Sequence, residues 1–284
     1  IDSIYDVPIN FEKDDLCNVV LEALNIKSRK TNGGLDPWRK FVSKVKHPKR
    51  ELKIAVVGKY FDTGDFVLSD AYVSVIEAVK FSAYTQNAKP VLSWLDSVEF
   101  EKHPGKVREL SQYDGVIVPG GFGERGIEGN INVIQYCREK KIPYFGLCYG
   151  MQLMVIEYAR HVAGLSGAHT AEINPEAKHV VIDIMPEQKK HLAEGRYGAS
   201  MRLGAYPAYL KKGTIARINY GKELVSERHR HRYEVNPKYI KQIEAAGLVF
   251  SGTSPDGRLM EIAELPASEH PFFLGTQFHP EFKA

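Results

Sequence analysis

The chain has 284 residues, with 43% hydrophobic and 26% charged residues and a formal net charge of +3. These values are ordinary for a globular protein with one large domain, or with one domain and a smaller piece. Because the net charge is small, we expect no nucleic-acid partner. The sequence shows no signal peptide and no apolar run long enough to span a membrane.

The three cysteines, Cys17, Cys137 and Cys148, are few and far apart. An odd number at wide spacing predicts no disulfide framework and indicates a reducing compartment, so we expect a cytoplasmic protein. Cys17 and Cys137 lie in helical patterns without glycine neighbours, and we expect both to be inert. The chain does not begin with Met, and we expect it to be a fragment of a larger protein.

The first 50 residues differ from the rest. Residues 12–25 carry apolar side chains at helical spacing and predict one helix. Residues 27–50 then contain nine Lys or Arg and a single acid, Asp36, with several Gly and Pro residues. Two interpretations stay open for this segment: a basic linker that lies on a partner surface, and a solvated linker with a short helix.

From residue 51 the predicted strands and helices alternate. Short apolar runs predict strands at 53–60, 91–95, 115–118 and 144–147. Helical patterns follow at a start capped by Ser69 or Asp70, at 127–140 and at 151–163. This alternation predicts an α/β fold with a mostly parallel central sheet and helices on both faces.

The second half has a more antiparallel character. Strands are predicted at 179–185, 248–252, 259–265 and 272–279, with a turn at 255–257 between the second and third of these. The predicted fold therefore includes an antiparallel subset of strands. Functional residues of such sheets lie beyond the carboxyl ends of the parallel strands, where two glycine-rich loops of this chain fall.

One of these loops carries Cys148 within the pattern G-x-C-x-G, at residues 146–150 between a strand and a helix. This pattern predicts a nucleophile elbow, because glycines allow the sharp turn and the strained backbone that a nucleophile often adopts there. The positive end of the following helix favours a thiolate over a thiol. A buried structural cysteine is the alternative, but such a cysteine needs no glycine on both sides.

The last residues offer a base for this thiol. His279 and Glu281 lie two residues apart in QFHPE, so in an extended segment they point the same way. Glu281 can then orient the imidazole of His279, which would activate the sulfur and later protonate the leaving amine. A lone histidine is more often structural, and the weight of this motif comes from the elbow elsewhere in the chain.

The other glycine-rich loop, PGGFG at residues 119–123, follows a predicted strand. A backbone N–H group near Gly121, together with that of Tyr149, would form an oxyanion hole. A phosphate-binding loop ranks lower, because no G-x-x-x-x-G-K-[ST] pattern is present. Plain turn glycines are the remaining alternative.

The motifs PGGFG, GLCYGMQ and QFHPEF occur in the order and spacing of the triad (class I) glutamine amidotransferases, which have a flavodoxin-like fold. The segments VVGKY (56–60), MRLG (201–204) and ERHRHRYEVNP (227–237) further resemble the glutaminase domain of the CTP synthase family. SIYDVP at 3–8 resembles the last part of that family's synthetase domain. The resemblance implies a synthetase tail plus basic interdomain linker at 1–51 and a glutamine amidotransferase domain at 52–284.

The resemblance assigns Cys148, His279 and Glu281 to the catalytic triad. It also implies contacts with the substrate L-glutamine for Gly121, Tyr149, Gly150, Met151, Gln152, Glu172 and Arg232. A Glu and an Arg suit the ammonium and the carboxylate of free glutamine. Tyr149 stands where many relatives have Leu, which we expect to narrow the pocket or the ammonia exit.

The implied activity is hydrolysis of L-glutamine to glutamate and ammonia through a γ-glutamyl thioester on Cys148. The ammonia would serve the amination of UTP to CTP in the synthetase domain, which is absent here. In the family that domain uses ATP and Mg²⁺, GTP activates the enzyme, and the whole protein tends to form tetramers. We expect no cofactor in this chain, and no metal site at His229 and His231, since further ligands at recognisable spacing are missing.

Three other functions stay open. The domain could be a glutaminase that serves another amidotransferase, or a γ-glutamyl hydrolase with the same triad. It could also be a non-catalytic module that senses GTP or mediates interactions through the basic segment 27–50. The intact Cys, His and Glu set favours an enzyme over the third of these functions.

Overall fold

The computed structural model describes residues 3–27, 34–59, 72–184 and 201–283. They divide into two units, one formed by Ile1–Leu52 with Val79–Pro90 and the other by Lys53–Ala78 with Val91–Ala284. Several predicted positions lie outside the described residues: residues 28–33 of the basic segment, the last residue of the strand predicted at 53–60, Ser69, Asp70, and the last residue of the strand predicted at 179–185. The assignment of residues 1–51 to a synthetase tail and linker stays a prediction.

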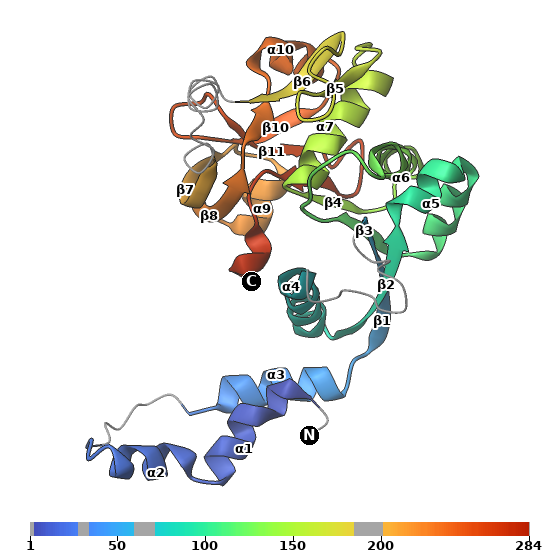
Figure 1. Cartoon of the computed structure of the whole chain (residues 1–284). Helices are drawn as coiled ribbons and strands as arrows, with labels where there is room; N and C mark the ends of the chain where they lie inside the picture. The colour runs from blue at the N-terminus through green and yellow to red at the C-terminus, as the bar shows by residue number, and fades with distance from the viewer. Residues whose placement is uncertain (1–2, 28–33, 60–71, 185–200, 284) are drawn as a thin grey trace. The chain divides into compact units, whose positions relative to one another are not determined.

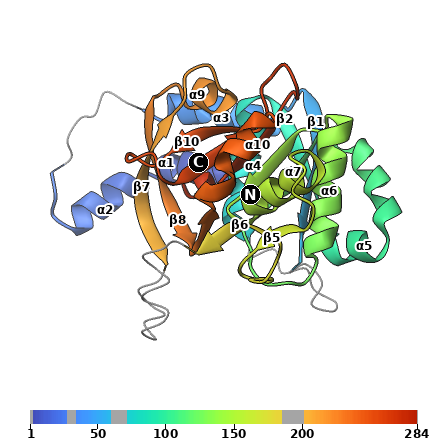
Figure 2. The same cartoon turned by 90° about the horizontal axis from the view of Figure 1, so that it is seen from above.

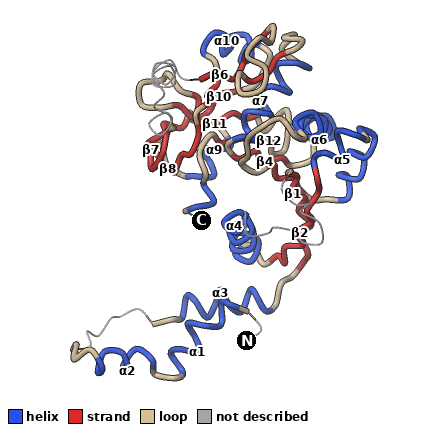
Figure 3. Tube along the Cα trace, viewed as in Figure 1, coloured by secondary structure: helices blue, strands red, loops and turns tan. Residues whose placement is uncertain are grey.

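The first unit is helical (Figure 3). It contains η1 (Ile4–Asp6), α1 (Val7–Lys13), α2 (Leu16–Ala23), α3 (Asp36–Lys46) and the end of α4 (Val73–Thr85). Aromatic rings join these helices, with ring centroids of Phe41 and Phe81 4.8 Å apart and those of Tyr5 and Phe41 5.2 Å apart. The basic segment therefore contains a helix of 11 residues with a packed aromatic face.

The single helix expected at residues 12–25 is wrong in extent. The chain breaks between α1 and α2 at Asp15, which adopts a left-handed conformation with φ of 53°. The Asp15 carboxylate accepts a hydrogen bond from the Asn18 side chain at 2.7 Å. Aspartate is a poor residue for a helix interior and tolerates the left-handed conformation, so the acidic pair Asp14–Asp15 ends the first helix.

The second unit is built on a nine-stranded sheet with the order β2-β1-β3-β4-β12-β11-β10-β7-β8 (Figure 1). The strands β1, β3, β4 and β12 pair in parallel, and β12, β11, β10, β7 and β8 pair antiparallel. This arrangement confirms the predicted fold class. Their bounds are β1 (Arg50–Gly58), β2 (Ala88–Asp96), β3 (Gly115–Val118), β4 (Tyr144–Leu147), β7 (Arg202–Leu210), β8 (Leu224–His231), β10 (Val249–Thr253), β11 (Met260–Glu264) and β12 (Phe273–Thr276).

Helices cover both faces of this sheet because successive strand residues point to opposite faces. In β12, Phe273 belongs to the larger core and Leu274 to the smaller one. On the larger core, α7 (Tyr149–His161) packs against β4 and β12, and α6 (Ile127–Lys140) lies beside α7 (Figure 2). The short helices α5 (Ser97–Lys102) and η3 (Pro104–Gln112) pack against α6. On the smaller core lies α9 (Ile215–Tyr220). Within the described ranges, no helix combines the length and apolarity needed to cross a membrane.

A second sheet of three strands packs against α7. It contains β5 (Ala168–Thr170), β6 (His179–Ile184) and β9 (Tyr233–Val235), and α10 (Pro237–Ala245) follows β9. The chain leaves the large sheet after β8 and enters the small sheet at β9, so Arg232 lies at the crossing between the two sheets.

The antiparallel strands β7 and β8 were not among the predicted strands. Side chains of β8 alternate between exposed and buried, and those that point inward include Glu227, His229 and His231. Because the inward positions are polar, the strand lacks the apolar alternation that identifies a half-buried strand. The outward-facing positions of β8 include the basic residues Arg228 and Arg230, which are exposed.

A buried ion pair joins α6 to α7. The guanidinium of Arg138 donates to both carboxylate oxygens of Glu157 at 2.8–3.2 Å, and Glu157 is fully buried. The ring of His161 lies 3.1 Å from the same carboxylate. Such a bidentate pair is among the stronger polar contacts of a protein interior.

Replacing one partner should therefore be costly. We expect Arg138→Met to lower the free energy of unfolding by about 3 kcal/mol, because a buried carboxylate loses its counter-ion. Urea denaturation measures this change, and the exposed Arg108→Met is the matched control. A double variant with Glu157→Met should recover part of the loss. Equal stability of Arg138→Met and Arg108→Met would contradict the structural role of the pair.

Candidate active site

Cys148 lies where β4 passes into α7, in a strained backbone conformation with φ of 50° and ψ of −97°. The two flanking glycines leave no room for a side chain. A Cβ on Gly146 would lie 2.6 Å from the Gly150 carbonyl carbon, and one on Gly150 would lie 2.2 Å from the Val118 carbonyl oxygen. The turn expected from the G-x-C-x-G pattern is therefore present, with the sulfur at the N-terminus of α7.

We expect Gly150→Ala to destabilise the domain by about 3 kcal/mol, since the added methyl group collides with the backbone of β3. The reaction of Cys148 with iodoacetamide should slow as the turn distorts. Denaturation and alkylation rates measure the two effects. Gly105→Ala is the control, because a Cβ there meets no atom within 4 Å. If Gly150→Ala matches that control in both measurements, the tight turn is not required.

His279 and Glu281 meet beside the sulfur. His279 Nδ1 lies 2.8 Å from Glu281 Oε1, and the imidazole lies close enough to Cys148 for the two groups to interact electrostatically. Because Nδ1 faces the carboxylate, Nε2 is the ring nitrogen that faces the sulfur. Both side chains are largely buried, with 12% and 7% exposed. The structure thus brings the three residues of the predicted triad together.

The route to this contact differs from the expected one. Strand β12 ends at Thr276, and residues 280–282 form a short 3-10 helix, so the strand predicted at 272–279 is too long. The His279 N–H group donates to the Arg228 carbonyl of β8 at 2.8 Å. His279 and Glu281 therefore meet through a turn that β8 fixes, and not through strand alternation.

The imidazole of His279 is set for a positive charge. Burial alone would lower its pKa, but hydrogen bonds to Cys148 and Glu281 and the negative charges of these two groups raise the pKa of His279 to about 10. An imidazolium beside the sulfur favours a thiolate and can give a proton to a leaving group.

This shift has a consequence for stability. The pKa of His279 rises from 6.5 to about 10 on folding, so its contribution to stability is complete below about pH 6.5 and is lost as the pH rises through 10. We expect the stability difference between the natural chain and His279→Gln to shrink over this range, as measured by denaturation at several pH values. The surface variant His103→Gln is the control. A constant difference would show that the charged imidazole is absent from the folded state.

The glycine-rich loop after β3 covers the sulfur. A Cβ on Gly120 would lie 3.0 Å from His279 Cε1 and 3.8 Å from Cys148 Cβ. A Cβ on Gly121 would lie 3.6 Å from the ring of Tyr149. The loop and the first turn of α7 therefore flank the same space, and the N–H groups proposed as oxyanion donors belong to these two segments.

Lys59, which was not among the predicted site residues, contacts this loop through its side chain. Its Nζ donates to the Gly123 carbonyl at 2.6 Å and lies 4.9 Å from the ring centre of Tyr149. Burial lowers the pKa of Lys59 to about 8, although the charge of Glu172 acts in the opposite direction. In the sequence Lys59 lies at the carboxyl end of a buried strand and within the VVGKY segment, but neither feature identifies its contact with the loop.

Tyr149 is also tied to the loop. Its hydroxyl donates to the Gly123 carbonyl at 2.9 Å, and the side chain is 3% exposed. A leucine at this position has no such donor. The expected effect of Tyr149 on pocket width stays a prediction, and the structure adds a hydrogen bond between the helix and the loop.

The residues expected to contact glutamine separate into two groups. Glu172 accepts a hydrogen bond from the Gly123 N–H group at 2.9 Å, and both Glu172 and Arg232 act electrostatically on the Tyr233 hydroxyl. Glu172 therefore lies beside the loop, and the charges of Glu172 and Arg232 both reach Tyr233. In contrast, the side chain of Met151 is fully buried against β12, so only its backbone can face a substrate.

The other cysteines and the histidine pair of β8 do not form a second catalytic or metal site among the described residues. Cys137 is buried, and burial raises the pKa of its thiol well above the ordinary range, whereas Cys17 is exposed. The rings of His229 and His231 lie 2.9 Å apart, nitrogen to nitrogen. In the described part of the chain, no three His, Cys, Asp or Glu side chains are grouped so that they could hold a metal ion.

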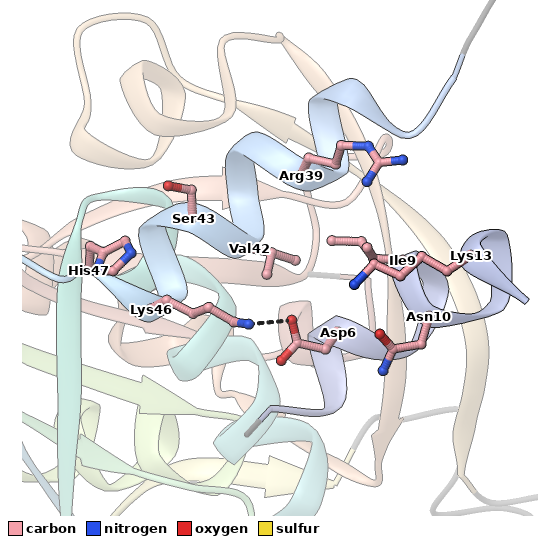
Figure 4. A pocket seen from close by; sticks show the side chains of 9 residues that line it. All are labelled: Asp6, Ile9, Asn10, Lys13, Arg39, Val42, Ser43, Lys46 and His47. Atoms are coloured by element: carbon pink, nitrogen blue, oxygen red, sulfur yellow. Dashed lines mark ion pairs between the residues drawn. The ribbon is translucent and has the colours of Figure 1, made fainter. Parts of the chain in front are cut away.

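The first unit contains a separate hollow of about 450 Å³ between α1 and α3 (Figure 4). Its charges are largely paired: Lys46 Nζ lies 2.8 Å from Asp6, and Arg39 pairs with Glu12. The hollow contains neither a cysteine nor a histidine–carboxylate pair, so it lacks the groups of a covalent catalyst. It is lined by Asp6, Ile9, Asn10, Lys13, Arg39, Val42, Ser43, Lys46 and His47.

Comparison with known proteins gives a consistent assignment. The family model for glutamine amidotransferase class-I matches residues 67–284. CTP synthases of Halalkalibacterium halodurans and Methanocaldococcus jannaschii are 47% and 48% identical to this chain over 99% of its length. These matches cover 50% and 51% of the relatives, so the chain spans about half the length of the curated relatives it matches.

Among solved structures, the chain is similar to the glutaminase domain of Trypanosoma brucei CTPS with bound acivicin. The TM-score is 0.73 and the sequence identity is 37%, over 81% of this chain and 86% of that one. The chain belongs to the class-I glutamine amidotransferases. Within that family it is a glutaminase domain of the CTP synthase type.

Proposed function

We propose that this domain hydrolyses L-glutamine to glutamate and ammonia through a thioester on Cys148. The observation that supports this function best is that Cys148, His279 and Glu281 lie together beside the glycine-rich loop, with His279 hydrogen-bonded to Glu281. A thiol with a base and an orienting carboxylate is the minimum for acyl transfer, and the loop provides a place for oxyanion donors.

The first half of the reaction forms the thioester. The Cys148 thiolate attacks the side-chain amide carbon of glutamine, and the N–H groups of Gly121 and Tyr149 stabilise the oxyanion. His279 gives its proton to the departing nitrogen, the C–N bond breaks, and ammonia leaves. Glu281 keeps the imidazole in the orientation that this transfer requires.

The second half releases glutamate. A water molecule gives a proton to His279 and attacks the thioester carbon. The C–S bond then breaks and returns the thiolate of Cys148. The sum is glutamine plus water to glutamate plus ammonia, and the imidazolium of His279 is restored at the end.

Substrate binding uses the charged groups around the loop. We assign the ammonium of glutamine to Glu172 and its carboxylate to Arg232, because their charges match these groups, Glu172 is bound to the loop at Gly123, and both charges act on Tyr233. Backbone groups of Gly150, Met151 and Gln152 complete the proposed pocket.

For the whole protein we propose amination of UTP to CTP by the ammonia that this domain releases. The remaining half, which the curated relatives possess, would form the synthetase domain and would use ATP and Mg²⁺. We further propose GTP as the activator, a tetramer as the assembly and the cytoplasm as the location, where the Cys148 thiol stays reduced.

Labelling tests the proposed nucleophile. We expect acivicin, which is bound in the Trypanosoma brucei domain, to modify Cys148 once per chain, as located by peptide mass spectrometry. Cys148→Ala should lose the label and should reduce ammonia release from glutamine by about 10³-fold or more. The exposed Cys17→Ala is the control and should label as the natural chain does.

A label that persists in Cys148→Ala would overturn the assignment of the nucleophile. Release of glutamate from γ-glutamyl peptides at a rate above that of ammonia release from glutamine would instead indicate a γ-glutamyl hydrolase.

A further inference from the structure

Gln277 lies against the reactive sulfur but has no part in the mechanism above. It follows β12 directly and is fully buried. Its Nε2 lies 3.6 Å from Cys148 Sγ, within hydrogen-bond reach for sulfur. Its backbone N–H group donates to the Glu261 carbonyl at 2.8 Å, which fixes the position of the residue between the two strands.

The orientation of this amide follows from its neighbours. Gln152 Nε2 lies 2.9 Å from the Tyr233 carbonyl oxygen, which can only accept. The same nitrogen lies 3.1 Å from Gln277 Oε1. The two hydrogens of the Gln152 amide thus go to Tyr233 and Gln277. A reversed Gln277 amide would place its NH₂ group against that of Gln152, donor against donor, so Gln277 must point an N–H group at the sulfur.

The other neighbours of the sulfur make this donor significant. The Arg230 carbonyl oxygen lies 3.9 Å from Cys148 Sγ and can accept a hydrogen bond only from a thiol. Its partial negative charge opposes a thiolate. Gln277 acts in the opposite sense, because an amide N–H group binds the anion more strongly than the neutral thiol. His279 and Gln277 therefore both favour the thiolate.

We propose that Gln277 is a catalytic residue that stabilises the thiolate of Cys148 through its side-chain N–H group, and that Gln152 sets its orientation. The proposal rests on the proposed glutaminase function, in which the thiolate is the nucleophile. The sulfur is anionic before thioester formation and neutral afterwards. The contribution of Gln277 is therefore lost in the thioester and regained when the C–S bond breaks, so loss of the donor should leave less reactive thiolate for acylation and should also slow the departure of the thiolate in hydrolysis.

Several titratable side chains lie around the sulfur of Cys148 and affect the pH profile of its reactions. His279 and Glu281 follow β12, and His229 and His231 project inward from β8. Burial, together with the charge of Arg202, lowers the pKa values of His229 and His231, so both stay neutral above about pH 6. His279 is then the titrating group in contact with Cys148.

The test measures the rate at which iodoacetamide alkylates Cys148, read at the Cys148 peptide by mass spectrometry, as a function of pH. Iodoacetamide does not use the glutamine pocket, so it reports the thiolate itself. In Gln277→Met, which keeps the length of the side chain, we expect the midpoint of the profile to rise by about one to two pH units. Gln277→Glu keeps the shape but places a negative charge beside the sulfur, and should raise the midpoint at least as much.

Two further variants complete the set. Gln152→Met frees the Gln277 amide to rotate and should raise the midpoint by a smaller amount. Gln242→Met is the matched control, since this exposed glutamine donates to the Ala163 carbonyl at the surface. In steady-state hydrolysis of glutamine, we expect kcat of Gln277→Met to fall about 10-fold or more while KM changes little, because the lost interaction is with the nucleophile. Either Gln277 variant suffices if the other fails to fold.

Unchanged alkylation midpoints in a folded Gln277 variant, with a natural chain that hydrolyses glutamine, would overturn the role of Gln277 and leave the glutaminase intact. A rise in KM at constant kcat would also overturn it, since that pattern belongs to substrate binding. If Cys148 of the natural chain is not alkylated and the chain releases no ammonia from glutamine, the proposed glutaminase function itself is wrong.

Discussion

The active site depends on one strained turn, at Cys148, where the backbone adopts φ of 50° between a buried strand and a buried helix. The turn closes because Gly146 and Gly150 have no side chains, and any methyl group there would collide with backbone atoms. The Cys148 N–H group is bound to the Thr276 carbonyl of the neighbouring strand at 2.6 Å. The sulfur is therefore held at the carboxyl edge of the sheet and at the start of α7, where the helix dipole and free N–H groups act on the same point.

Parallel pairing explains why distant segments meet at this point. Strands β3, β4 and β12 run side by side, so the loops that follow them leave the sheet at one edge. These loops carry Gly121, Cys148 and His279, which are far apart in the sequence. The antiparallel half contributes through its backbone: β8 holds His279 by the carbonyl of Arg228 and places the carbonyl of Arg230 near the sulfur.

The polar interior of β8 has a structural explanation in this arrangement. Arg202 on β7 pairs with Glu261 on β11 at 2.7 Å. His229 and His231 lie in contact beside this pair, and burial lowers the pKa of His231 to about 3, so its ring stays neutral. Buried groups of this kind need good geometry to be tolerated, and the network fixes the register of the strand whose carbonyls reach the active site.

The sequence by itself determined the order of strands and helices from 115 to 163, the elbow at Cys148 and the polar partners His279 and Glu281, because local spacing and glycine positions encode them. It did not reveal the β8 strand, whose inward face is polar, or Lys59, whose role comes from the loop above it. In the sequence, Gln277 is the first residue of the QFHPEF motif, which assigns it no role. Its contact with the sulfur required β12 to lie beside β4, since a hydrogen bond between residues 129 positions apart exists only after the sheet has formed.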